Sequence, residues 1–168
     1  MKKTLFFSII AAAAMAVVSC DEVKDAINDF EDDQPAKMEE SNGGLTIIFS
    51  CKQSGVGMYI TTNFEVPGTV TLNVPDTLCS YCNLKTTYPL ETAAQAAYDS
   101  KVDGLTEQQI KDLNVKLDGK VLTFDQPEFV GKSKLIVKTS LYATVKAFEK
   151  GSQAANQQIQ NGAAQAAN

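Results

Sequence analysis

Alternation of apolar and polar positions is clearest between residues 45 and 74, where it predicts a series of short strands. Residues 45–51 place every second side chain on one apolar face: Leu45, Ile47, Phe49 and Cys51. Residues 56–62 and 68–74 are also short, rich in β-branched side chains and bounded by turn residues. This period-two pattern is typical of half-buried strands. We therefore predict an antiparallel meander in this part of the chain.

The middle of the chain carries helix signals followed by a hairpin signal. Residues 91–101 are rich in good helix formers. Thr106, with Gln109 three residues later, fits a capping box that opens a second short helix. Asp118 and Gly119 lie between two short alternating runs, and this dipeptide is typical of a tight hairpin turn.

Residues 134–148 alternate over a length that suggests one strongly bent strand or two consecutive strands. Residues 151–168 have no charge and one large apolar side chain, Ile159, and are low in complexity. We expect this tail to be disordered or to form a marginal helix.

Together these patterns predict one globular domain over residues 45–150. Its expected fold class is α+β, mostly antiparallel strands with one or two short helices between residues 90 and 113. A β-sandwich is the alternative.

Residues 1–19 have the features of a secretory signal peptide. Lys2 and Lys3 precede the apolar residues 5–18, and small side chains follow. This apolar run is shorter than the roughly 20 residues that a membrane-spanning helix needs. Export is therefore expected, with an uncleaved membrane anchor as the alternative.

The end of this segment, Val17-Val18-Ser19-Cys20, resembles a bacterial lipobox. The resemblance implies that Cys20 receives a diacylglycerol on its thiol, becomes the first residue after cleavage and is then N-acylated, typically with palmitate. Several acyl chains together hold a protein stably on a membrane. The competing interpretation is an ordinary signal peptide that happens to contain a cysteine.

Residues 20–44 are predicted to be a lipidated acidic tether. Residues 21–40 hold nine acidic side chains against two lysines, whereas residues 41–168 hold eleven of each sign. An acidic stretch directly after the lipidated cysteine resembles the export signal of Bacteroidetes surface lipoproteins. In enterobacterial sorting, an aspartate at this place tends instead to retain a lipoprotein at the inner membrane. Such a polar segment also suits a simple solvated spacer.

Three absences narrow the function classes, because the chain has no Arg, no His and no Trp. The commonest general base and metal ligand is therefore missing, as is the bidentate clamp for phosphate. A neutral domain on an acidic tether also lacks the basic surface of a nucleic-acid binder. We expect no nucleic-acid partner, no cofactor and no metal, since three cysteines without histidine are an incomplete zinc set.

Apart from Cys20, the cysteines are Cys51, Cys79 and Cys82. The last two form a CxxC motif, which in an exported chain is either a redox dithiol or part of a structural disulfide. The motif does not follow a strand into a helix, as thioredoxin-like chemistry requires. Cys51 pairing with Cys79 or Cys82, and Cys79 pairing with Cys82, are all left open as structural disulfides.

Asp76-Thr77-Leu78 resembles the short acceptor motif for O-glycosylation in exported Bacteroidetes proteins. The resemblance marks Thr77 as the acceptor. An ordinary turn after Pro75 is the alternative.

The leading functional hypothesis is a non-enzymatic lipoprotein of the outer membrane that acts as an accessory or binding module. Exposure at the cell surface is expected, with a domain that faces the periplasm as the alternative. Its partner would be an envelope protein or ligand. Carbohydrate binding would rely on tyrosines in the absence of Trp: Tyr59, Tyr81, Tyr88, Tyr98 and Tyr142. The alternative is a membrane-tethered thiol-disulfide oxidoreductase that uses Cys79 and Cys82. A hydrolase with paired carboxylates is a third, unsupported by any spacing.

Overall fold

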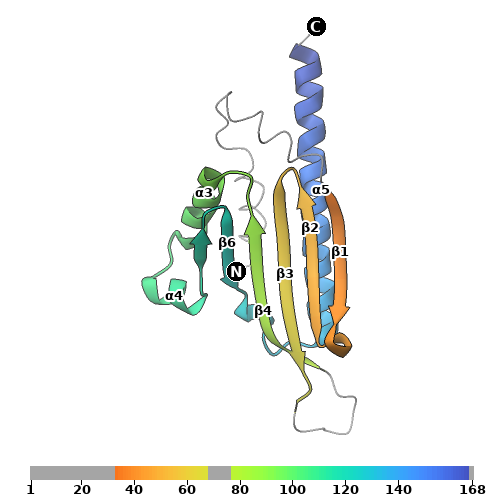
Figure 1. The fold of residues 1–168 in the computed structure, drawn as a ribbon, viewed down its shortest axis with the longest axis vertical. Helices are drawn as coiled ribbons and strands as arrows, with labels where there is room; N and C mark the ends of the chain where they lie inside the picture. Colours follow the sequence, from red (N-terminus) through yellow and green to blue (C-terminus); the bar gives the residue numbers. More distant parts are fainter. Residues whose placement is uncertain (1–32, 68–76, 167–168) are drawn as a thin grey trace.

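The protein is described by a computed structural model that covers residues 33–67 and 77–166. Within these residues, one six-stranded sheet has the strand order β1-β2-β3-β4-β6-β5, and each pair of neighbours is antiparallel. Helices pack against this sheet (Figure 1). The expected α+β class with mostly antiparallel strands is confirmed.

The elements follow one another along the chain in this order: β1 (Gln34–Ser41), η2 (Asn42–Gly44), β2 (Thr46–Gln53), β3 (Val56–Glu65), β4 (Leu78–Thr87), α3 (Glu91–Val102), α4 (Glu107–Asp112), β5 (Lys116–Asp118), β6 (Val121–Asp125), η3 (Pro127–Phe129) and α5 (Lys134–Ala166).

The β2–β3 hairpin confirms the first alternating segment. Ile47, Phe49 and Cys51 are buried, and the residues between them are more exposed. Ser54 and Gly55 connect the strands with φ angles of 53° and 76°, a turn geometry that suits the right-handed twist of a hairpin. The strand predicted at 68–74 lies outside the described residues.

The predicted helices and the second hairpin are also confirmed. Helix α3 occupies the expected stretch. Thr106 and Gln109 form both bonds of the capping box at the start of α4. The β5–β6 hairpin forms where predicted, with Asp118 as the last residue of β5 and Gly119 and Lys120 as the turn.

The strand prediction for residues 134–148 is wrong, because this stretch begins the 33-residue helix α5. Val137, Leu141 and Val145 recur every four residues and are almost completely buried, which is a helical period. Alternation of apolar and polar side chains, with Leu135, Val137, Leu141, Val145 and Ala147 on one face, favoured a strand. The helix continues past the end of the sheet to Ala166 (Figure 1). Residues 151–166 are therefore helical, which was one of the two states expected for the tail.

Strand β1 corrects part of the predicted tether 20–44. Residues 34–41 pair with β2 at the edge of the sheet, although only Ala36 among them is buried. Backbone hydrogen bonds do not require apolar side chains, so the pattern could not reveal this strand. Two ion pairs also hold it, since Glu40 lies 3.3 Å from Lys134 and 2.5 Å from Lys138 on α5.

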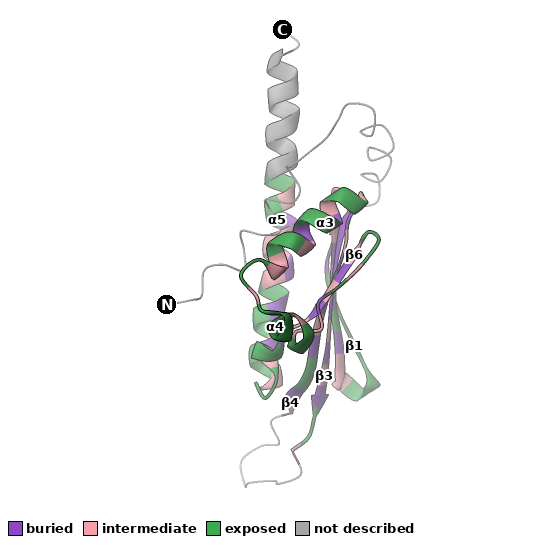
Figure 2. Cartoon of the chain, turned by 90° about the vertical axis from the view of Figure 1, so that its left-hand side faces the viewer, coloured by how far each residue is buried: buried purple, intermediate pink, exposed green. Residues whose placement is uncertain are grey.

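All the described helices cover the same side of the sheet, as Figure 2 shows. Helix α5 crosses β1 and β2, while α3 packs under β5 and β6. The core between the layers is apolar and includes Ile47, Phe49, Met58, Ile60, Leu84, Leu122, Phe124, Val137, Leu141 and Val145. A sheet with helices on one face is not the β-sandwich that was the alternative.

The described helices include none with both the length and the apolar character that crossing a bilayer requires.

Leu141→Ala is expected to lower the free energy of unfolding by about 2–5 kcal/mol, because it removes a side chain that is 1% exposed from the α5–sheet interface. Leu135→Ala, on the same helix but 73% exposed, should change it by less than about 0.5 kcal/mol. Urea unfolding followed by circular dichroism measures both. Equal effects of the two substitutions would contradict the described position of α5.

Candidate binding surface

The side of the sheet that faces away from the helices is a polar and aromatic surface. Buried side chains on each strand point toward the helices, so the residues between them point outward. Cross-strand pairing then places these side chains together on the outer face: Lys37, Glu39, Ile48, Ser50, Tyr59, Thr61, Asn63, Tyr81, Asn83, Lys85, Thr123, Asp125 and Lys116. No described helix lies on this face (Figure 2).

One row of this face crosses all six strands in direct register. We call it the lysine row, and its members in strand order are Lys37, Ser50, Tyr59, Lys85, Thr123 and Lys116. Neighbouring strands lie about 4.8 Å apart. Lys37 and Lys85 are three strands apart, or about 14 Å, and Lys85 and Lys116 are two strands apart, or about 10 Å. The row contains no carboxylate.

The neighbouring row carries the opposite charge. Its members are Glu39, Ile48, Thr61, Asn83 and Asp125. The Asn83 amide Nδ2 donates a hydrogen bond of 2.8 Å to Oδ1 of Asp125, which fixes that carboxylate within its own row. The lysine row therefore lies directly beside a row with acidic ends on the outer face.

Tyr59 and Tyr81 are the aromatic side chains of the outer face, with 37% and 41% of each exposed. The Tyr59 ring leans over Gly57, where an added Cβ would lie only 3.1 Å from Cε2 of the ring. Glycine at position 57 thus leaves room for the ring to rest against the strand. Of the other candidate tyrosines, Tyr88 is buried in the core and Tyr142 lies on α5.

Cys79 and Cys82 lie within β4, and each is only 2% exposed. Phe64 pairs with Cys79 and Asn63 pairs with Tyr81, so Ser80 is an extra residue in this strand. Such a bulge changes the alternation of side chains. Both cysteines of the CxxC motif consequently point into the core.

The sheet register separates Cys51 from the other two cysteines. Cys51 pairs with Met58 and Cys82 pairs with Thr62, a difference of four residues or about 13 Å along β3. A disulfide needs Cα atoms within about 7 Å. The register therefore holds Cys51 too far from Cys79 and Cys82 for either of the pairings that the sequence left open, and all three thiols are free in this structure.

Burial makes these thiols weak acids. It raises the pKa of Cys51 to about 11, and it raises the pKa of Cys79 and Cys82 as well. Each thiol donates to an oxygen of the protein: Cys51 to the Gln34 carbonyl, Cys79 to the Tyr81 carbonyl and Cys82 to Oε1 of Gln126. Reactive cysteines have the opposite character, with exposed sulfur and a lowered pKa.

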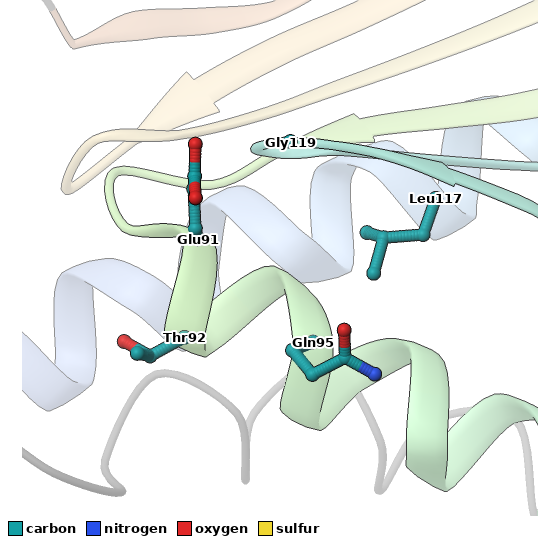
Figure 3. A pocket seen from close by; sticks show the side chains of 5 residues that line it. All are labelled: Glu91, Thr92, Gln95, Leu117 and Gly119. Atoms are coloured by element: carbon teal, nitrogen blue, oxygen red, sulfur yellow. The ribbon is translucent and has the colours of Figure 1, made fainter.

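A shallow hollow of about 390 Å³ lies where the first turn of α3 meets the β5–β6 hairpin (Figure 3). Glu91, Thr92, Gln95, Leu117 and Gly119 line it. Glu91 is the one titratable side chain in this lining, so the hollow has no partner for general acid–base chemistry. Elsewhere in the described residues, no three potential metal-ligating side chains come together.

The remaining predicted site residues are Thr77 and Cys20. Thr77 is half-buried next to the start of β4, and its carbonyl accepts a hydrogen bond of 2.9 Å from the Lys134 amide. Cys20 lies outside the described residues, as does Asp76. Lipidation of Cys20 and glycosylation of Thr77 stay predictions.

The lysine row was not anticipated from the sequence. Its members come from six strands, so it depends on strand order and register. Alternation of polar side chains within each predicted strand is the signal that could have indicated an open face.

Comparison of the chain with protein-family models, with curated proteins and with solved structures gives no match.

The native thiols should react slowly with iodoacetamide at pH 8. The pKa of about 11 lowers the thiolate fraction of Cys51 at pH 8 about 100-fold relative to an ordinary thiol, and burial keeps the reagent away from all three cysteines. The Cys51 thiol ionises near pH 9 in the unfolded chain but only near pH 11 in the folded protein. The free energy of unfolding should therefore fall as the pH rises from about 9 to about 11. Mass spectrometry of the alkylated protein, with and without urea, measures the protection. Rapid labelling of Cys79 or Cys82 in the native protein would contradict this description.

Proposed function

We propose that this protein is a lipid-anchored, non-enzymatic binding module of a bacterial outer membrane, exposed at the cell surface. In this proposal, the outer face of the sheet contacts an envelope component. The observation that carries it is the asymmetry of the fold: helices cover one face of the sheet and leave a broad, mixed aromatic and charged face open.

A sheet of this kind suits recognition better than chemistry. Side chains on paired strands keep fixed spacings, which makes the sheet a rigid platform for binding groups. Exposed tyrosines supply large contact area at low conformational cost. Tyr59, Tyr81 and Ile48 provide such area on the outer face, with lysines beside them.

The cysteines weigh against the oxidoreductase alternative. That function needs an accessible CxxC with an acidic thiol. Cys79 and Cys82 are buried in a strand and have raised pKa values. The hydrolase alternative gains no support either, since the lining of the hollow contains a single carboxylate.

The anchor rests on the lipobox resemblance at Cys20. Twelve residues lie between Cys20 and Asp33, the first described residue. Even a fully extended chain of this length spans at most about 45 Å. The domain would therefore work close to the bilayer surface.

Metabolic labelling with an alkyne analogue of palmitate tests the anchor. The wild-type protein and a Cys51→Ala control should both take up the label, and Cys20→Ala should lose it, since Cys20 is the proposed attachment residue. Membrane fractionation and protease digestion of intact cells should place the labelled protein at the surface of the outer membrane. Label on Cys20→Ala, or a wild-type protein without label, would refute lipid anchoring at this residue.

A further inference from the structure

We infer that the lysine row binds a linear anionic polysaccharide, with Tyr59 as a stacking platform between Lys37 and Lys85. This inference rests on the proposed function, because it names the ligand class for the outer face of the sheet. The juxtaposition that carries it is an uninterrupted row of lysine, hydroxyl and tyrosine side chains across six strands.

The three lysines of the row are available for a ligand. Lys37, Lys85 and Lys116 are exposed and make no ion pair with any carboxylate in residues 33–67 and 77–166. Three of the four lysines on α5 behave differently, since Lys134 and Lys138 pair with Glu40 and Lys146 pairs with Glu149. The positive charge of the row is thus left uncompensated by the fold.

The acidic row next to it restricts how an anionic ligand can lie. Glu39 and Asp125 are displaced from the lysine row by two residues along their strands, which is about 7 Å. A polyanion crossing the face obliquely would approach these carboxylates. A chain lying along the lysine row meets lysines and hydroxyl groups only, so charge complementarity favours that direction.

The spacing of the lysines favours a ligand with sparse charge. Intervals of about 14 Å and 10 Å follow from the strand spacing. A nucleic-acid strand in a duplex carries one phosphate about every 3.4 Å, and its binders have dense basic surfaces. This protein is acidic overall, with a formal charge of −5. A polysaccharide with carboxylates or sulfates separated by one or more sugar rings suits both the spacing and the overall charge.

The neutral members of the row suit sugar rings. Sugars present apolar C–H faces that stack on aromatic rings, and the Tyr59 ring is exposed at the centre of the row. Ser50 lies beside Tyr59 in the row and Thr123 lies beyond Lys85, and their hydroxyl groups can donate to and accept from sugar hydroxyls. No large aliphatic side chain belongs to the row, whereas the core of a protein–protein interface is usually apolar.

Isothermal titration of the full-length protein, purified in detergent, tests this inference. The probes are polygalacturonate and chondroitin sulfate as anionic polysaccharides, and dextran as a neutral one. Poly(U) and vesicles containing anionic phospholipid represent the other polyanions. The row variant is Lys37→Gln/Lys85→Gln/Lys116→Gln. Its matched control, Lys111→Gln/Lys132→Gln/Lys150→Gln, changes the net charge equally at exposed lysines outside the row.

At least one anionic polysaccharide should bind, with an affinity that falls as salt rises, and dextran should not. The Kd for that polysaccharide should be about tenfold or more higher in the row variant than in the wild-type protein. In the control variant, the Kd should stay within about twofold of the wild-type value. Tyr59→Leu should raise the Kd about threefold to tenfold through loss of the flat ring. Circular dichroism establishes that each variant is folded.

Three results would overturn the inference: no binding of either anionic polysaccharide, an equal loss in the row and control variants, or tighter binding of poly(U) or vesicles through the row. None of these results bears on lipid attachment at Cys20, which the palmitate label measures separately. If the protein carries the palmitate label at the cell surface but its lysine row binds no anionic polysaccharide, the proposal of a binding module stands and the proposed ligand class is refuted.

Discussion

Packing of α5 against the sheet is the interaction on which the rest of the structure depends. Val137, Leu141 and Val145 bury their side chains across β1 and β2, and burial of each such residue stabilises the fold by about 1.5–3 kcal/mol. The ion pairs of Glu40 with α5 fix the polar edge strand to the same helix. Because helices α3, α4 and α5 share one side, the described residues form a single apolar core, and none of these helices covers the other face of the sheet.

The two sides of strand β4 carry different kinds of side chain. The bulge at Ser80 turns Cys79 and Cys82 into the core, where both thiols become weak acids and contribute to packing. The same strand presents Tyr81, Asn83 and Lys85 on its outer side. One strand thus supplies inert cysteines to the interior and polar groups to the surface, which supports a binding role over a redox role.

Local patterns predicted local structure well. Alternation indicated β2 and β3, the capping box indicated the start of α4, and Asp118-Gly119 indicated the β5–β6 turn, because each signal acts within a few residues. Residues 134–148 were misassigned because alternation of apolar and polar side chains obscured the four-residue period of Val137, Leu141 and Val145. Strand β1 and the lysine row escaped prediction for another reason. Both arise from pairing between distant segments, which no local pattern records.

Labelling of lysines on intact cells tests most directly whether the open face is a binding surface. An amine-reactive acetylating reagent would be applied to cells carrying the protein and to the purified protein, and each lysine would be quantified by mass spectrometry. Occupation of the open face in the envelope predicts that Lys37, Lys85 and Lys116 are protected on cells relative to the purified protein. Lys111, Lys132 and Lys150 should react equally in both. Equal reactivity of all six lysines in the two samples would contradict the account.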